Sequence, residues 1–168
     1  MNPAQVTPVL MDSERDNEGR LVGLVFDSTP PLEAPGVNPW LVAVDSSENA
    51  LRAVAHAAAQ ADEMNTCALH LINVQPWLSR EAAEAELAHR ALGATARARA
   101  TLDAKGLPWR LHVAMGDSAE RIIERAAQLC ASGIVIGSRG LGVTEGLLFG
   151  SVTSKLMHLG GPPLSVVP

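Results

Sequence analysis

The sequence predicts an α/β domain with a parallel sheet and helices on both of its faces. From Trp40 onward, short apolar runs of strand type alternate with longer segments in which apolar residues recur at helical spacing. Strands that are joined by helices run parallel, and the joining helices cover the faces of the sheet. Alanine is abundant in the helical segments, where it favours helix formation and lets a helix approach the sheet closely.

The first half of this domain contains two expected strands and one expected helix. Residues 40–44 form an apolar run that ends at Asp45, and residues 67–74 form a second run that Pro76 stops. The first run has the composition of a buried strand. Between them, apolar residues repeat at helical spacing at Leu51, Val54, Ala55, Ala58 and Ala61.

The second half continues the same alternation to the end of the sequence. A long helix is expected to begin after Ser79. Residues 109–115 alternate in polarity as a strand does, and Asp117 with Glu120 has the spacing of a capping box that opens the next helix. Two further strands are expected at residues 134–136 and Leu164–Val167, with a short helix over residues 151–159 between them.

Composition excludes several classes of protein. With 168 residues the chain has the length of one domain and needs no metal or disulfide to fold. A net charge of -5 argues against a nucleic-acid or anionic-membrane surface, and no apolar run reaches the length of a membrane span. Cys67 and Cys130 imply no disulfide framework. Because the N-terminus also lacks the pattern of a signal peptide, a cytoplasmic location is expected.

Residues 1–39 differ from the rest of the chain, and we expect an irregular N-terminal arm outside a domain of residues 40–168. Proline neither continues a helix nor donates to a sheet, and this region holds Pro3, Pro8, Pro30, Pro31, Pro35 and Pro39. One short strand is expected at residues 21–26, in a hairpin-like segment laid over the main domain. The alternative is a partly disordered tail.

A glycine-rich segment follows the fourth expected strand of the domain, at the edge where open α/β sheets bind ligands. Gly137 and Gly140 leave the strand, and Gly150 with Ser151 begins the last helix. Glycine adopts positive φ and lets backbone N–H groups approach a ligand, while a helix N-terminus attracts anions. Two glycine pairs in these places suit a polyphosphate. The alternative is a strand-to-helix loop without a ligand, because the segment matches neither the P-loop nor the GxGxxG pattern.

Asp45 is the second candidate, because it ends the first strand of the domain, where ligand-contacting side chains usually lie. A carboxylate in this place accepts hydrogen bonds from both hydroxyls of a ribose. The alternative is that Asp45, Ser46 or Ser47 serves as the N-cap of the following helix.

These residues resemble the ATP-binding branch of the universal stress protein family. The family motif, G-2x-G-9x-G-(S/T), is matched by Gly137, Gly140 and Gly150-Ser151, and the similarity runs from about Trp40 to Pro168. The resemblance implies a Rossmann-like open sheet of five parallel strands in the order 3-2-1-4-5, with the switch point between the first and fourth strands. Asp45 would then lie beside Gly137.

The resemblance also implies a nucleotide site and a partner. Asp45 would hold the ribose, the backbone of Val74 would bind adenine, and backbone N–H groups of the glycine motif would bind phosphates. The implied nucleotide-binding residues are Ala43, Val44, Asp45, Val74, Ile136, Gly137, Arg139, Gly140, Gly150, Ser151 and Val152. The implied ligand is ATP, with or without Mg²⁺. The implied partner is a second copy of the chain, paired through the last strand, Leu164–Val167.

The chain departs from the family pattern at two places outside the phosphate loop. Ser132 and Gly133 stand where the family usually has an aspartate before the fourth strand. Ser118 stands where the family commonly has a proline. Residues 1–39 have no counterpart that the resemblance assigns.

The sequence contains no motif typical of metal binding, of a serine hydrolase or of a redox protein. The histidines, His56, His70, His89, His112 and His158, show no metal-binding spacing. Neither the G-x-S-x-G nucleophile elbow nor a CxxC motif is present. We therefore assign no catalytic residue and no metal ligand.

The sequence thus predicts an ATP-binding protein of the stress response that acts as a regulator or sensor rather than as an enzyme. One alternative is slow ATP hydrolysis or self-phosphorylation, for which Glu145 is the further carboxylate near the loop. Another alternative is a dimeric interaction module whose pocket is vestigial and whose N-terminal arm binds a partner.

Overall fold

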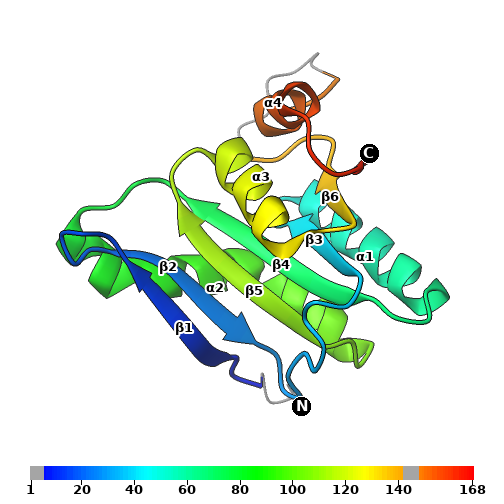
Figure 1. Ribbon diagram of the computed structural model, residues 1–168, viewed down its shortest axis with the longest axis horizontal. Coiled ribbons are helices and arrows are strands. Elements are labelled where there is room, and N and C mark those ends of the chain that lie inside the picture. The colour runs from blue at the N-terminus through cyan, green and yellow to red at the C-terminus, as the bar shows by residue number, and fades with distance from the viewer. Residues whose placement is uncertain (1–5, 142–147) are drawn as a thin grey trace.

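The computed structural model describes residues 6–141 and 148–168, which form one mixed sheet with two helices on each face (Figure 1). The strands are β1 (Val9–Arg15), β2 (Leu21–Asp27), β3 (Pro39–Ala43), β4 (Ala68–Gln75), β5 (Trp109–Met115), β6 (Gly133–Gly137) and β7 (Leu164–Val167). The helices are α1 (Glu48–Glu63), α2 (Arg80–Ala104), α3 (Ser118–Leu129) and α4 (Ser151–Leu159).

The predicted number of strands is wrong. Within the described residues the sheet has seven strands in the order β1-β2-β5-β4-β3-β6-β7. The five strands from β3 onward pair in parallel, whereas β1 and β2 pair antiparallel with each other, and β2 pairs antiparallel with β5. The predicted order 3-2-1-4-5 therefore does not describe the whole sheet, but only the run of neighbours from β5 to β7.

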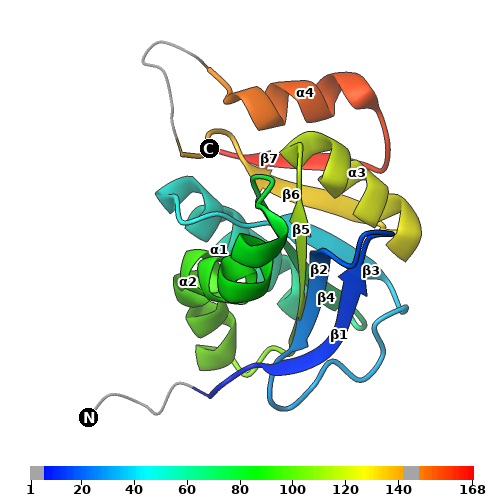
Figure 2. The same cartoon turned by 90° about the vertical axis from the view of Figure 1, so that its left-hand side faces the viewer.

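The expectation of helices on both faces is confirmed. Figure 2 shows α1 and α2 on one side of the sheet and α3 and α4 on the other. Val54 of α1 and Leu87 of α2 belong to one core cluster, and Ile122 of α3 and Leu156 of α4 belong to the other. Burial of these apolar faces against the strands is the main force that holds the layers together.

The N-terminal region forms a β-hairpin over residues 9–27, where the sequence led us to expect one hairpin-like segment in an otherwise irregular arm. The charged stretch makes a tight turn, because Asp16 Oδ1 accepts hydrogen bonds from the amides of Glu18 and Arg20 and Gly19 adopts a φ of 79°. The strand expected at residues 21–26 is present as β2. The division of the chain at residues 39 and 40 into two units stays a prediction.

The hairpin extends the central sheet through β2. Leu21, Leu24 and Phe26 are buried in the same core cluster as α1 and α2. Asp27, with its side chain 2% exposed, forms an ion pair of 2.7 Å with Arg110 of β5. The other strand of the hairpin, β1, is exposed along its whole length and forms one edge of the sheet.

Three helices begin at the residue types that favour a helix N-terminus. Ser47, Ser79 and Asp117 each accept a hydrogen bond from the amide three residues later. The expected starts after Ser79 and Asp117 are thereby confirmed, and Ser47 is the N-cap among the three candidates at the start of α1. The fourth helix, α4, begins at Gly150 without a side-chain cap.

Candidate functional site

A cavity of about 300 Å³ lies at the carboxyl ends of β3, β4 and β6. It lies at the switch point of the sheet, because β3 pairs with β4 on one side and with β6 on the other. The first turns of α1, α3 and α4 complete its wall. Its lining residues are Ala43, Val44, Asp45, Ser47, Ala50, Ile72, Asn73, Val74, Ser118, Ile122, Ile136, Gly137, Arg139, Gly140, Leu141, Gly150, Ser151, Val152 and Thr153.

Every residue that the sequence assigned to nucleotide binding lines this cavity. These residues come from the end of β3, the end of β4, the loop after β6 and the first turn of α4. Sequence reasoning missed the remaining lining residues, which are Ser47, Ala50, Ile72, Asn73, Ser118, Ile122, Leu141 and Thr153. Several of the missed residues belong to the starts of helices whose approach to the cavity depends on the tertiary fold.

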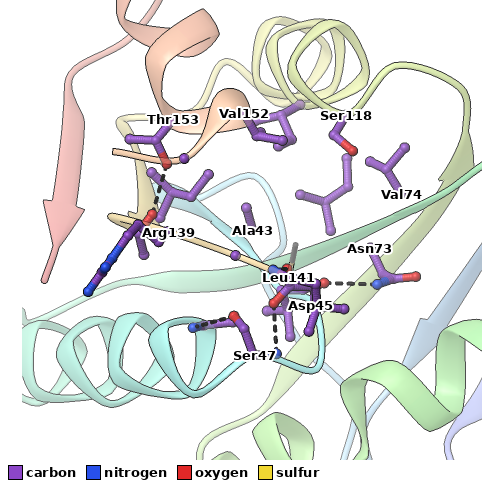
Figure 3. A pocket seen from close by; sticks show the side chains of 18 of the residues that line it. Ala43, Asp45, Ser47, Asn73, Val74, Ser118, Arg139, Leu141, Val152 and Thr153 are labelled. Carbon is purple, nitrogen blue, oxygen red and sulfur yellow. Dashed lines mark hydrogen bonds between the residues drawn. The ribbon is translucent and has the colours of Figure 1, made fainter. Parts of the chain in front are cut away.

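Asp45 lines the cavity from the loop between β3 and α1 (Figure 3). Its Oδ1 accepts a hydrogen bond of 2.9 Å from the amide of Ser47, and its Oδ2 accepts one of 3.2 Å from the amide of Leu141. Because Ser47 is the N-cap of α1, Asp45 is not needed for capping. Each carboxylate oxygen keeps a further lone pair for a ligand.

The glycines of the motif allow close backbone contacts. A Cβ on Gly137 would come 2.8 Å from backbone atoms of Asn49, and a Cβ on Gly140 would come 2.6 Å from Oδ2 of Asp45. A Cβ on Gly150 would come 3.3 Å from the Cα of Arg139. These glycines do not adopt positive φ, so the expectation that Gly137 and Gly140 use that freedom is wrong. What they need is the space that a side chain would fill.

Ser138 joins the loop after β6 to three other elements. Its amide donates to the carbonyl of Val167 in β7 over 2.7 Å, and its carbonyl accepts from the amide of Gly150 over 2.8 Å. Its buried hydroxyl accepts from Asn49 Nδ2 of α1 over 3.2 Å. The two glycine pairs of the motif are thus held at a fixed spacing on one side of the cavity.

The two ends of the cavity differ in chemistry. One end is formed by Gly140, the exposed Arg139 and the N-terminus of α4, so it presents a cation and backbone N–H groups. The other end is formed by aliphatic side chains, including Ile72, Val74 and Ile122. Figure 3 shows Arg139 and Thr153 at one end, Val74 and Ser118 at the other, and Asp45 between them.

Lys155 ties the two helices that border the cavity. Its Nζ lies 3.1 Å from Asp117 Oδ1 and 3.6 Å from Glu120 Oε1, so that α4 is attached to the start of α3. The pKa of Lys155 is raised by its hydrogen bond to Asp117. The pKa of Asp117 is lowered, first by the hydrogen bond from the amide of Glu120 and then by Lys155. These groups are exposed, so the ion pairs contribute little to stability but favour one spacing of the two helices.

Comparison with known proteins assigns the family. A family model described as the universal stress protein family matches residues 38–168. The chain belongs to the universal stress protein family. No curated protein sequence matches the chain significantly.

Solved structures of other universal stress proteins share the fold. A protein from Archaeoglobus fulgidus is 24% identical, with a TM-score of 0.63 over 77% of this chain and 98% of that chain. The A. fulgidus universal stress protein in complex with dAMP is 22% identical, with a TM-score of 0.62 over 77% of this chain and 97% of that one. A universal stress protein in complex with cAMP is 22% identical, with a TM-score of 0.64 over 78% of this chain and 97% of that one.

This member of the family also has a histidine pair that sequence reasoning missed. His70 of β4 and His112 of β5 lie on adjacent strands, and His70 Nδ1 is 2.9 Å from His112 Nε2. Burial is the main cause that lowers the pKa of both residues, that of His112 to about 2. Among the described residues, no group of three or more His, Cys, Asp or Glu side chains could hold a metal ion.

Two further observations concern this universal stress protein as a whole and the loop beside the site. None of the helices in residues 6–141 and 148–168 is long and apolar enough to cross a membrane. Glu145, the carboxylate considered for hydrolysis, lies outside the described residues, as do Gly142 and Gly146.

Proposed function

We propose that this universal stress protein binds an adenine nucleotide, with ATP as the principal ligand, in the cavity at the switch point. The observation that carries the proposal is the order of chemistry along the cavity. An aliphatic end suits a base, the Asp45 carboxylate suits a ribose, and the amide-rich glycine end suits phosphates. The volume of about 300 Å³ is within the usual range for ligand sites.

The role of each residue follows from its place along this cavity. Asp45 accepts the ribose hydroxyls through the lone pairs that Ser47 and Leu141 leave free. Val74 binds the base through its backbone. The remaining residues of the proposed site are Ala43 and Val44 on the nucleoside, Ile136 and Gly137 between sugar and phosphates, and Arg139, Gly140, Gly150, Ser151 and Val152 on the phosphates.

Structures of similar proteins support an adenine nucleotide as the ligand of this cavity. The complexes with dAMP and cAMP share the fold of this chain and contain adenine. ATP, rather than a monophosphate, is favoured by the extent of the glycine end, where two glycine pairs and Arg139 offer donors to several phosphate groups. Mg²⁺ would be held mainly by the phosphates and water, as is usual for nucleotide-bound Mg²⁺.

We further propose that the protein acts by binding and regulation, in the cytoplasm, rather than by catalysis. Among the described residues Asp45 is the carboxylate that lines the cavity, and both of its oxygens already accept backbone hydrogen bonds. Phosphoryl transfer needs a group that orients the nucleophile in addition to ligands of the phosphates. A single-turnover assay with radiolabelled ATP is therefore expected to release no ADP or phosphate.

A homodimer paired through β7 is the proposed assembly. β7 is an edge strand with one neighbour, β6, and such an edge presents unpaired backbone groups to a partner. An apolar groove lined by Ile134, Leu156, Leu164 and Val166, among others, lies beside it. Sedimentation equilibrium is expected to give twice the mass of the chain, and a monomer at micromolar concentration would contradict the assembly.

The nucleotide is tested most directly in the purified protein. The protein is denatured and its small-molecule content is measured by mass spectrometry, and ATP or another adenine nucleotide is expected. The stripped protein is then titrated with ATP, AMP and GTP by calorimetry, with and without Mg²⁺. The proposal fails if no nucleotide is released and none of the titrations gives heat of binding.

A further inference from the structure

Ser118 places a hydroxyl group at the aliphatic end of the cavity. It is the first residue of α3, directly after the N-cap Asp117, and it lines the cavity. Figure 3 shows Ser118 on the same side as Val74, with Arg139 at the opposite end. The hydroxyl therefore lies where the base of a bound nucleotide is proposed to be.

The other polar side chains around this end have partners within the protein. Asn73 donates from Nδ2 to the carbonyl of Val44 over 2.9 Å and accepts on Oδ1 from Gln75 over 2.8 Å. Asp117 accepts from the amide of Glu120 over 3.0 Å. These groups are occupied in holding strand ends and the start of α3 in place.

The hydroxyl of Ser118 has no such partner among the described residues. A serine hydroxyl offers one donor and two acceptor lone pairs. It is not needed as a helix cap, because Asp117 has that role. Ser118 is half-buried, and it lines the cavity together with the apolar residues Val74 and Ile122. A polar group in this setting gains most from a ligand that satisfies it.

We propose that Ser118 determines base specificity by forming a hydrogen bond to the purine base that lies against Val74. Adenine suits a hydroxyl that both donates and accepts, because its ring nitrogens accept and its exocyclic amine donates. This inference rests on the proposed nucleotide binding, and it assigns to Ser118 a contact with the base rather than with sugar or phosphate. A site that hydrogen-bonds a ligand atom discriminates against analogues that lack the atom.

Three substitutions of Ser118 distinguish the effect of its hydroxyl on binding from the effect of the backbone of α3. Ser118→Ala removes the hydroxyl, and Ser118→Thr keeps it. Ser118→Pro removes it in a position where proline is well tolerated, since the first residue of a helix needs no amide donor. Ser132→Ala is the matched control, because Ser132 lies before β6, outside the cavity, and bonds Asn38.

The test is calorimetric titration of these proteins with ATP and with three analogues: 7-deaza-ATP, 1-deaza-ATP and purine riboside triphosphate. In the natural protein, one analogue is expected to bind about two- to tenfold more weakly than ATP. Ser118→Ala and Ser118→Pro are expected to bind ATP more weakly than the natural protein does, by a similar factor. Their affinity for that one analogue is expected to equal that of the natural protein. Ser118→Thr and Ser132→Ala are expected to retain the preference for ATP.

The outcomes separate the two proposals. Ser118→Ala could weaken the binding of ATP and of every analogue by the same factor, or leave the binding of all of them unchanged. Either result would show that Ser118 makes no hydrogen bond to the base, and the inference would be wrong. If the natural protein binds no ATP, the proposed function itself fails, and the inference fails with it. Thermal denaturation of each variant shows whether a change in binding reflects loss of the fold.

Discussion

The backbone amide of Leu141 donates a hydrogen bond to Oδ2 of Asp45 over 3.2 Å. The preceding residue, Gly140, approaches the same oxygen so closely that a Cβ there would lie 2.6 Å from it. The loop after β6 is thus in direct contact with the carboxylate at the end of β3. A ligand that binds the carboxylate therefore lies next to the amides of this loop, as the sugar and phosphates of one nucleotide require.

Replacing Asp45 with alanine is expected to weaken ATP binding about ten- to a hundredfold. The substitution removes charge-assisted hydrogen bonds to the ribose, which contribute about 1.5–3 kcal/mol. Isothermal titration calorimetry measures the change. Asp62→Ala is the control, because Asp62 is exposed at the end of α1 and does not line the cavity. If Asp45→Ala binds ATP as tightly as the natural protein, the assignment of the ribose is wrong.

Replacing Gly140 with valine is expected to weaken ATP binding by at least about tenfold. The added side chain meets Asp45 Oδ2 and must displace either the carboxylate or the loop, which costs about 1–3 kcal/mol. Gly36→Val is the matched control, because nothing lies within 4 Å of a Cβ at Gly36. Calorimetry with ATP compares the two variants, and unchanged binding in Gly140→Val would exclude this loop from the site.

The sequence predicted the arrangement of β3 to β7 better than that of the hairpin. The alternation of apolar runs with helical periods is a local signal, and it marks each parallel strand from β3 onward. The strand β1 carries no such signal, because all of its residues are exposed and its charged half has no buried face. Its pairing with β2, and that of β2 with β5, depends on contacts between segments far apart in the chain.

The candidate site, like the sheet, was predicted where the sequence carries a local signal and missed where the position of a residue depends on tertiary packing. The family resemblance predicted that Asp45 lies beside Gly137, because the strand order that it implies makes the first and fourth strands of the domain neighbours. The structure adds a reason that the motif does not contain: Gly137 must lack a side chain because Asn49 of α1 packs against it. Ser118 departs from the family pattern, but its place on the cavity wall depends on how α3 packs against the sheet.

Gly133 and Gly93 are expected to respond to alanine in opposite ways. Gly133 of β6 lies against the ring of Trp40 on the neighbouring strand, and a methyl group there would overlap the ring. Gly133→Ala is therefore expected to lower the free energy of unfolding by about 1–3 kcal/mol. Gly93 is exposed within α2 and has nothing within 4 Å, so Gly93→Ala should raise it by about 0.5–1 kcal/mol.

Urea denaturation of both variants measures these changes. Equal midpoints for Gly133→Ala and the natural protein would show that Trp40 moves aside without cost, and the proposed packing reason for Gly133 would be wrong.

Deleting residues 1–38 is expected to destabilise the remaining protein rather than remove a dispensable arm. The deletion removes Leu21, Leu24 and Phe26 from the core, at about 1.5–3 kcal/mol each, and exposes the edge of β5. None of the described residues of this segment, 6–38, lines the cavity, so ATP binding should persist in the folded fraction. Urea denaturation checks the first expectation and calorimetry the second. An unchanged midpoint would support two independent units.

Burial holds the histidine pair in its neutral form, and the hydrogen bonds of the pair determine which ring nitrogens carry a hydrogen. The carbonyl of Pro35 can only accept, so His70 Nε2 carries a hydrogen and donates to it over 2.8 Å. His70 Nδ1 then accepts from His112 Nε2, which leaves His112 Nδ1 buried without a partner in the part of the chain that the structure describes. Arg110 and Arg125 oppose an added positive charge on His112, after the dominant effect of burial.

Lowering the pH is expected to destabilise the fold through this pair. The folded pKa of His112, about 2, lies below the unfolded value of about 6.5, so the unfolded chain binds a proton that the folded chain excludes. Stability is therefore fully present above pH 6.5 and declines below it. Between pH 7.5 and 5.5, His112 alone should lower the free energy of unfolding by about 1.4 kcal/mol, with a further loss from His70.

Comparison of two histidine variants isolates this contribution. His112→Gln removes the titrating ring. Between pH 7.5 and 5.5 its free energy of unfolding should therefore fall by about 1.4 kcal/mol less than that of the natural protein. His89→Gln is the matched control for the loss of a histidine, because His89 is exposed on α2 and lies outside the buried pair. Urea denaturation of the natural protein and the two variants at both pH values gives three pH-dependent changes in the free energy of unfolding. Parallel pH profiles for His112→Gln and the natural protein would mean that the buried ring takes up its proton as readily as the unfolded chain does.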